Sequence, residues 1–480
     1  MDEEGIIITR VPGDSHKLEP DALGVVQDTV IGLATSAPAG TLAATLPIAL
    51  TTAYGSGPVL LLAAIPMLIV ANSYKQLNKW NATCAATFEW VGLAINPYLG
   101  FLTGWIMILG YIITTIAEVV VLGPSVLTVF NDPDASTWSY VWVDTGLCLA
   151  MLIIAVLGIR LTAKTQIVMA AVEYAILLFF SIAGLTLVLM HHPGTYPITS
   201  GWFRLSGIEG KGSLAAGLLA AVYVYSGYDG TIYVNQEVRH RQINPGRAIV
   251  WATVILAGLY TLAQVGLQGM VKPAQLQAHA ASALVYTAQA IGGPVGGRVM
   301  ALAIALSVTA ATGTGIVLTA RIVYGMAGRK VLPVTLGNIW PRFRTPGPAS
   351  ILVGFLIIAI MWAYMLTASI TNVFSNVVAV AGLLFTIFYV MTAITTIVYY
   401  RRDVFRSFRT FITTGLLPFG AAVFLGWVFV KSLFQAPSGQ LWSVAGVVAT
   451  GVVMTFVARF VFRSSFFSIH REKHQSGHES

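Results

Sequence analysis

The sequence has few charged residues and almost no cysteine, and each scarcity excludes a class of protein. Only 10% of its 480 residues are Asp, Glu, Lys or Arg, whereas a soluble domain has about a quarter. Cys84 and Cys148 are too few for a disulfide framework and lack the spacing of a zinc site. The chain has no His-Glu-x-x-His, nucleophile elbow or phosphate loop, which argues against an enzyme. We therefore expect no cofactor and no metal.

Apolar sequence, by contrast, is abundant. Hydrophobic residues make up 56% of the chain, in runs of about 20 residues, the length of a helix that crosses a bilayer. The runs lack the alternation of barrel strands. We predict an all-α polytopic membrane protein whose main partner is the lipid bilayer. Its twelve predicted transmembrane helices are residues 24–50, 57–77, 98–129, 139–158, 164–190, 213–235, 247–270, 297–324, 349–368, 371–399, 411–431 and 441–462.

The basic residues predict the orientation of these helices. With both termini in the cytoplasm, 22 of the 27 Lys and Arg residues face the cytoplasm and 5 face outward. The net charge of +8 thus follows the topology and indicates no nucleic-acid partner. The first 20 residues lack the apolar core of a signal peptide. We expect cytoplasmic tails at 1–20 and 464–480, and a transporter domain at 21–463 in a plasma (inner) membrane.

Two of the predicted helices contain an interruption. Pro38 and Gly40 lie within the first, and Gly227, Asp229 and Gly230 lie within the sixth. Irregular backbone at membrane depth is tolerated where it lines a cavity, although a proline kink is an alternative for the first helix. The interruptions are about 190 residues apart, which predicts inverted repeats over about 21–190 and 211–400, with additional helices over about 411–462. Residues 79–90 predict a short interfacial helix.

Four stretches resemble the amino acid–polyamine–organocation (APC) superfamily, in its amino acid permease branch. They are Asn96-Pro97-Tyr98-Leu99-Gly100-Phe101 with Gly104, Trp105 and Tyr111; Gly227-Tyr228-Asp229 with Glu237, Asn244, Pro245 and Arg247; Arg321-Ile322-Val323-Tyr324-Gly325-Met326-Ala327 with Leu332, Pro333, Thr345 and Pro346; and Tyr399-Tyr400-Arg401-Arg402. The resemblance implies a LeuT-like fold of two inverted five-helix repeats, with substrate between broken helices 1 and 6 and helices 3 and 8. In the first break the family often has Gly-Ser-Gly or Gly-Ala-Gly, whereas this chain has Ala37-Pro38-Ala39-Gly40.

The helix interruptions suit a zwitterionic substrate. The half-helix that begins near Gly40 and Thr41 would direct backbone N–H groups and its positive dipole end at a substrate carboxylate. Carbonyl groups near Ser36, Ser226 and Gly227 would accept hydrogen bonds from the substrate ammonium. No Lys or Arg lies near the middle of any predicted span. These features favour an amino acid as the substrate.

Three acidic residues in or near the membrane have two interpretations each. Asp229 either shapes the break or contacts substrate or a proton, and Glu118 either pairs with a substrate amine or makes a structural hydrogen bond. Glu173 lies where related transporters often carry a residue that replaces a coupling cation, which suggests proton coupling. Tyr225 and Tyr228 either close over the substrate or pack. The predicted substrate-binding residues are Ser36, Ala37, Gly40, Thr41, Glu118, Tyr225, Ser226, Gly227, Tyr228 and Asp229.

We predict a secondary active transporter that moves amino acids by alternating access, coupled to protons through Glu173. Sodium is the competing ion, for which Ser307, Thr309, Thr312 and Thr314 offer hydroxyls that also bond their own helix. A carrier or exchanger of cationic amino acids or polyamines is an alternative, since the intramembrane charge is wholly acidic. An ion channel would favour a symmetric pore and gives no reason for paired breaks. The sequence contains no signal for an oligomeric state.

Overall fold

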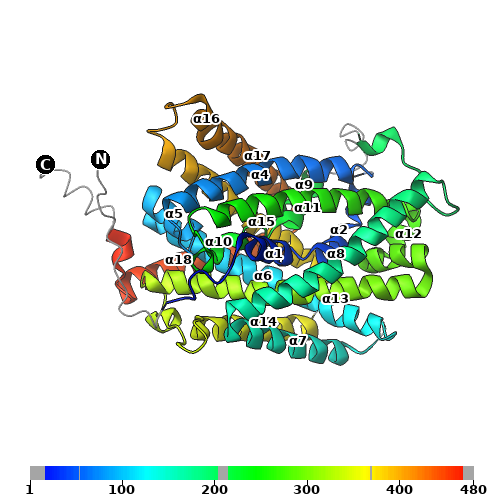
Figure 1. The fold of residues 1–480 in the computed structure, drawn as a ribbon, viewed down its shortest axis with the longest axis horizontal. Helices are drawn as coiled ribbons and strands as arrows, with labels where there is room; N and C mark the ends of the chain where they lie inside the picture. Colours follow the sequence, from blue (N-terminus) through cyan, green and yellow to red (C-terminus); the bar gives the residue numbers. More distant parts are fainter. Residues whose placement is uncertain (1–16, 53, 134, 204–213, 368–369, 469–480) are drawn as a thin grey trace, which may run out of the picture.

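The computed structural model describes residues 17–52, 54–133, 135–203, 214–367 and 370–468, so residues 1–16 and 469–480 of the predicted tails lie outside it. The described chain is helical (Figure 1). Its α-helices are α1 (Val25–Thr35), α2 (Pro38–Thr45), α3 (Ile48–Thr51), α4 (Ser56–Trp80), α5 (Thr87–Ala94), α6 (Pro97–Val129), α7 (Thr137–Leu157), α8 (Ile159–Leu189), α9 (Leu214–Tyr225), α10 (Gly230–Tyr233), α11 (Asn244–Gln268), α12 (Pro273–Ala278), α13 (Ala283–Gly328), α14 (Gly347–Thr367), α15 (Ile370–Tyr400), α16 (Phe408–Thr410), α17 (Leu417–Gln435) and α18 (Ser438–Phe456). Short 3-10 or π segments are η2 (Ser200–Phe203), η4 (Asn235–Glu237), η5 (Ala280–Ser282), η6 (Val334–Gly337), η7 (Phe411–Leu416), η8 (Val457–Val461) and η9 (Ser465–Ser468).

The prediction of an all-α membrane protein is confirmed. Ten helices of the described chain are long and apolar enough to cross a membrane, and they match ten of the twelve predicted spans. The two predicted spans without a long helix are 24–50 and 213–235, which fall on α1 to α3 and on α9 and α10. These are the two segments in which the sequence predicts an interruption.

The first of these segments is divided between α1 and α2. α1 ends at Thr35, and Ala37 then adopts a left-handed backbone conformation with φ 43° and ψ 63°, which a regular α-helix does not contain. Pro38 takes the first position of α2, where its missing N–H costs no hydrogen bond. The chain therefore forms two helices here in place of one.

The second segment is interrupted between Tyr225 and Gly230. Gly227 has φ 95°, a region that favours glycine because a side chain is strained there. A Cβ atom on Gly227 would lie 2.7 Å from the carbonyl carbon and oxygen of Thr35 and 2.9 Å from the nitrogen of Ser36. The two interruptions therefore touch each other through their backbones.

The two interruptions lie at the centre of the helix bundle. α1 packs against α8, α10, α11 and α13, and Figure 1 shows it in the middle of the molecule. The most apolar windows of α6 and α13 are 83% and 89% buried, whereas those of the helices ending at Gln435 and Val461 are 28% and 22% buried. α6 and α13 are thus inner helices, and α17 and α18 are outer ones.

The segment after α4 differs from the predicted interfacial helix. α4 continues to Trp80, and the short helix α5 begins only at Thr87 and packs against α6. Trp90 is fully buried, and its indole N–H donates to the carbonyl of Asn81 at 2.8 Å. Polar residues predicted to face the membrane surface are used inside the protein, since Glu89 pairs with Arg329.

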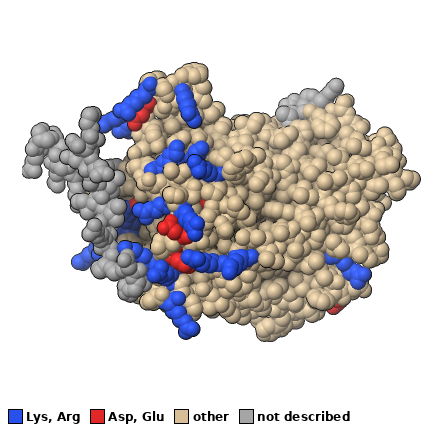
Figure 2. All heavy atoms as spheres, viewed as in Figure 1, with Lys and Arg blue, Asp and Glu red and all other residues tan. Residues whose placement is uncertain are grey.

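The basic residues gather at one end of the molecule. Figure 2 shows most of the visible Lys and Arg side chains at the end from which α1 starts, with a smaller group at the opposite end. We call the former the basic end. A long surface without visible charged side chains separates the two groups (Figure 2), as expected for a protein that spans a bilayer.

Candidate functional site

A small cavity lies where the two helix interruptions meet. Its volume is about 10 Å³, which is room for about one water molecule. The described residues that line it come from both interruptions and from α6, α13 and α15: Thr35, Tyr111, Thr114, Thr115, Glu118, Gly227, Ala311, Gly315 and Phe385. Residues from five separate parts of the sequence therefore converge on one point.

Glu118 gives this cavity its charge. Among the described lining residues it is the one with a charged side chain, and it is only 6% exposed. Thr114 and Thr115 precede it on α6, and Thr115 donates its hydroxyl proton to the carbonyl of Tyr111 at 2.8 Å. The cavity thus presents a carboxyl group, hydroxyl groups and aromatic rings, a set of groups suited to an ammonium group.

Glu173 belongs to α8, and its side chain reaches the start of α2. It is not one of the described residues that line the cavity. Its Oε1 accepts a hydrogen bond from the backbone N–H of Ala39 at 2.9 Å, and the Ser307 hydroxyl oxygen accepts one from the N–H of Gly40 at 3.3 Å. These are the first two N–H groups of α2, because Pro38 has none. A carboxyl group of the protein thus occupies the positive end of α2.

The two glutamates are electrostatically linked. Glu118 and Glu173 are close enough to interact through their charges, and the Oε2 atom of Glu173 has no hydrogen-bond partner among the described residues. Two acidic side chains, one from α6 and one from α8, are thus brought near each other at the centre of the bundle.

Asp229 is held by a group of tyrosines. Its Oδ2 accepts hydrogen bonds from Tyr233 at 2.7 Å and from Tyr74 at 3.4 Å, and its Oδ1 accepts one from Tyr389 at 3.1 Å. The tyrosines belong to α10, α4 and α15, so the carboxyl group joins three helices behind the second interruption. Asp229 does not line the cavity, and these bonds favour its shaping role.

The carbonyl groups near the first interruption are already bonded in this conformation. The carbonyl of Ser36 accepts from the Thr41 hydroxyl at 2.7 Å and from Tyr260 at 3.1 Å. Gly40 packs against α13, where a Cβ would lie 2.5 Å from a methyl group of Val308. Ser36, Ala37, Gly40 and Thr41 therefore surround the start of α2 without lining the cavity.

The aromatic residues beside the second interruption differ from each other. Tyr225 donates to the carbonyl of Leu60 at 3.2 Å, whereas the buried Tyr228 hydroxyl has no partner among the described residues. Ser226 donates to the carbonyl of Tyr223 at 2.6 Å. Gly227 is the member of this group that reaches the cavity.

The hydroxyl groups predicted as a sodium site mostly bond their own helix. Thr309, Thr312 and Thr314 each donate to a carbonyl of α13 three or four residues earlier. Ser307 differs, because its oxygen accepts from Gly40 across the helix interface. Within the described chain, no three His, Cys, Asp or Glu side chains are arranged to hold a metal ion.

A buried ion pair joins η4, the short segment that follows α10, to α13. Arg321 donates from Nε to Glu237 at 2.5 Å and from an Nη atom to its other oxygen at 2.8 Å, and both side chains are at most 1% exposed. Glu237 thus has Arg321 as its ion-pair partner. Arg329 pairs with Glu89 instead.

Several residues of the site escaped the sequence analysis. Thr35, Thr114, Thr115 and Phe385 line the cavity but are common membrane residues, with no local signal to single them out. Two further buried acids, Asp28 and Asp144, lie within predicted spans 24–50 and 139–158. An acid within a span is by itself a signal of a functional residue. Neither oxygen of Asp28 has a partner among the described residues, whereas Asp144 accepts from the N–H of Gly123 at 2.6 Å.

Both cysteines are buried, as expected of apolar fillers. Cys84 lies between α4 and α5, outside the spans. Burial raises the pKa of its thiol to about 12, so the reactive thiolate is scarce at neutral pH.

The fold and site define a polytopic membrane protein of the transporter class. More particularly, the chain belongs to the amino acid permease family, whose model matches residues 26–458. This match confirms the resemblance seen in the sequence motifs and makes the protein a transporter, not an enzyme.

Curated relatives are also transporters. An uncharacterised transporter of Mycobacterium tuberculosis is 27% identical over 70% of this chain and 73% of its own length. The vacuolar cationic amino acid transporter 2 of Arabidopsis thaliana is 23% identical over 62% of this chain and 49% of its own. The methylthioribose transporter of Bacillus subtilis is 23% identical over 66% and 68%. The named substrates of these relatives thus differ in chemical class.

Solved structures share the fold at low sequence identity. A manganese transporter of Eremococcus coleocola aligns over 92% of this chain and 95% of its own with 10% identity and a TM-score of 0.61. MhsT, solved with L-phenylalanine, aligns over 84% of this chain and 98% of its own with 15% identity and a TM-score of 0.59. At such identities the likeness concerns the fold alone.

Proposed function

We propose that the protein is a secondary active transporter that moves amino acids across the plasma membrane by alternating access, coupled to protons. The observation that carries this proposal is the cavity between the two helix interruptions, with Glu118 as its charged group. In this proposal α1 with α2, and α9 with α10, cross the membrane as two discontinuous helices, which gives twelve spans: ten in two inverted repeats of five, and two additional ones. The basic end faces the cytoplasm.

Substrate binding requires a larger cavity than this conformation has. A volume of about 10 Å³ holds no amino acid, so the interrupted helices must move apart from α6 and α13 on one side or the other. Glu118 then accepts hydrogen bonds from the substrate ammonium. This position leaves the substrate carboxylate to reach the start of α2, where backbone N–H groups and the helix dipole favour an anion.

Glu173 couples this binding to a proton. In the present conformation its carboxyl group holds the N–H of Ala39, the group that the substrate carboxylate needs. A proton on Glu173 weakens its hold on the N–H, because a neutral acid is a poorer acceptor than a carboxylate. The substrate carboxylate then takes the N–H, so that proton and substrate bind together and are released together.

A carrier or exchanger of cationic amino acids or polyamines is the second candidate. The charged group in the cavity is Glu118, with Glu173 beside it, and no Lys or Arg is among the described lining residues. A site with two carboxyl groups is able to bind one ammonium for each. The cationic amino acid transporter of Arabidopsis thaliana supports this candidate.

Uptake into proteoliposomes tests both candidates. The purified protein is given a panel of radiolabelled amino acids and polyamines with a proton gradient, a sodium gradient or neither. Proton-driven accumulation of an amino acid supports the first proposal. Uptake of a cationic substrate only against preloaded substrate supports the second, and single-channel currents in a bilayer would contradict both.

A further inference from the structure

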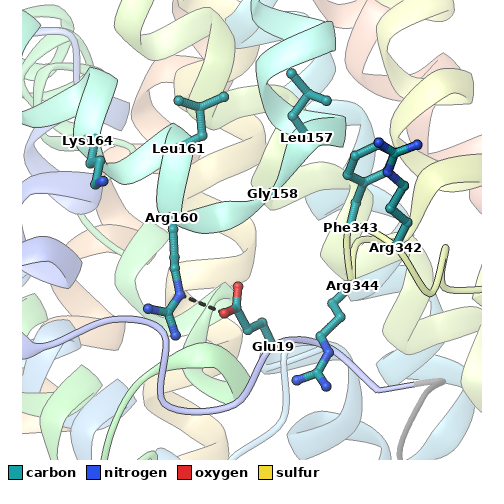
Figure 3. A pocket seen from close by; sticks show the side chains of 9 residues that line it. All are labelled: Glu19, Leu157, Gly158, Arg160, Leu161, Lys164, Arg342, Phe343 and Arg344. Carbon is teal, nitrogen blue, oxygen red and sulfur yellow. Dashed lines mark hydrogen bonds and ion pairs between the residues drawn. The ribbon is translucent and has the colours of Figure 1, made fainter.

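A second cavity lies at the basic end, away from the site described above. Its volume is about 460 Å³, and it is formed where α8 begins, beside the segment that precedes α1 and the loop before α14 (Figure 3). Four cationic side chains line it, Arg160, Lys164, Arg342 and Arg344, together with one carboxylate, Glu19. The lining thus has a surplus of three positive charges.

Most of this positive charge is not neutralised by the protein. Glu19 accepts a hydrogen bond from Arg160 at 2.6 Å, and Arg342 lies over the ring of Phe343 at 5.5 Å. In Figure 3, Arg160 and Arg344 extend on either side of Glu19. Among the described residues, no carboxylate forms an ion pair with Lys164 or Arg344.

The helix end that borders the cavity has the same sign. α8 is 31 residues long and has Gly158 as its N-cap, with no capping side chain and no acidic residue in its first turn. Gly158 itself lines the cavity. The positive end of the helix dipole therefore adds to the field of the four cations.

Apolar side chains stand next to these charges. Leu157 and Leu161 line the same cavity and are 43% and 39% exposed. Leu157 ends the apolar helix α7 and Leu161 lies in the first turn of the apolar helix α8, so the cavity lies where a bilayer surface is expected. A ligand with a charged head and an apolar tail fits this combination better than a wholly polar anion.

We propose that this cavity binds a phosphate-bearing anion, with the headgroup of an anionic phospholipid as the favoured source and free phosphate as the other. Guanidinium groups pair with phosphate oxygens through two parallel hydrogen bonds, which suits Arg160 and Arg344. Glu19 competes with the anion for Arg160. Because Glu19 lies six residues before α1, an anion that displaces it loosens the segment that leads into the first interruption.

The test uses the purified full-length protein in neutral detergent. Binding of short-chain phosphatidylglycerol, short-chain phosphatidylcholine and inorganic phosphate is measured separately by titration. We expect saturable binding of phosphatidylglycerol and none of phosphatidylcholine. Saturable binding of inorganic phosphate with equal affinity would also support the site, and would identify free phosphate as its source.

Three variants locate the site. Arg160→Gln with Arg344→Gln should weaken the binding roughly twenty-five-fold, at about five-fold per removed cation, and Glu19→Gln should strengthen it. Arg406→Gln is the matched control, because Arg406 is 79% exposed and pairs with Asp403 outside the cavity. Gel filtration and the melting temperature without ligand verify that each variant is folded.

Two results would overturn the proposal. One is the absence of saturable binding of either anion by the unaltered protein. The other is an equal loss of affinity in the double variant and in Arg406→Gln, because that result means the anion responds only to the overall charge of the basic end.

Discussion

The centre of the bundle and its basic end differ both in charge and in packing. At the centre the charged groups beside the cavity are acidic, namely Glu118 and Glu173, and the cavity has a volume of about 10 Å³. At the basic end a cavity of about 460 Å³ is lined by four cationic side chains. A charge is costly inside a membrane protein and cheap at its surface. An acid at the centre therefore indicates a function. The basic residues at the end are explained by the topology, and they indicate a binding site only where they line a cavity.

The largest effect is expected between the two regions, at the buried pair of Arg321 and Glu237. Arg321→Met leaves an uncompensated buried carboxylate, which costs about 3–5 kcal/mol of folding free energy. The double variant Arg321→Met with Glu237→Leu should regain most of that loss. Thermal unfolding of the purified variants measures both, and a single variant as stable as the double would show that the pair is not desolvated.

The contact between the two interruptions comes next. Gly227→Ala places a methyl group against the carbonyl of Thr35 and strains a backbone at φ 95°, at a cost of about 2–4 kcal/mol. Gly258→Ala on α11 is the control, because nothing lies within 4 Å of its Cβ. Equal melting temperatures for the two variants would refute the backbone contact at the centre.

Removal of charge from the central cavity should lower substrate affinity with little effect on the fold. Glu118→Gln loses a charge-assisted hydrogen bond to the substrate ammonium, worth about 1.5–3 kcal/mol or roughly a 10- to 150-fold loss of affinity. Asp403→Asn removes an acid from the basic end and should leave uptake unchanged. Equal uptake by the two variants would remove Glu118 from the substrate site.

The coupling role of Glu173 is tested by pH. Glu173→Gln cannot release a proton, so accumulation driven by a pH gradient should fall to the level seen without a gradient, while exchange of substrate continues. The uptake rate of this variant should also depend less on pH than that of the unaltered protein. Retained proton-driven accumulation would exclude Glu173 as the coupling residue.

The smallest effect is expected among the tyrosines around Asp229. Tyr389→Phe removes one of three hydrogen bonds to this carboxyl group, for a loss of about 0.5–1.5 kcal/mol. Tyr228→Phe is the matched control, because the Tyr228 hydroxyl has no partner among the described residues. A larger loss of stability in Tyr228→Phe would contradict the assignment of these bonds.

Local pattern was enough to locate the ten long apolar helices and the two apolar segments that form shorter ones. A run of apolar residues predicts a span because the backbone satisfies its own hydrogen bonds within each helix, and ten long helices follow that pattern. Pro38 and Gly227 act on their own backbone, so their effect is also visible in the sequence. The segment at 79–90 ends α4 and begins α5 where one short helix was predicted, and its Glu89 has a partner, Arg329, that is distant in the chain.

The central site depended on contacts that no local pattern contains. Glu173 was predicted as a coupling residue by resemblance, but its bond to Ala39 joins residues 134 positions apart, and the bond between Gly40 and Ser307 spans 267 positions. The sequence by itself determined the helices, their breaks and the end that is basic, because propensity and hydropathy act over a few residues. Only the tertiary structure decided which acid meets the cavity and which meets a helix end, because packing brings those groups together from separate helices.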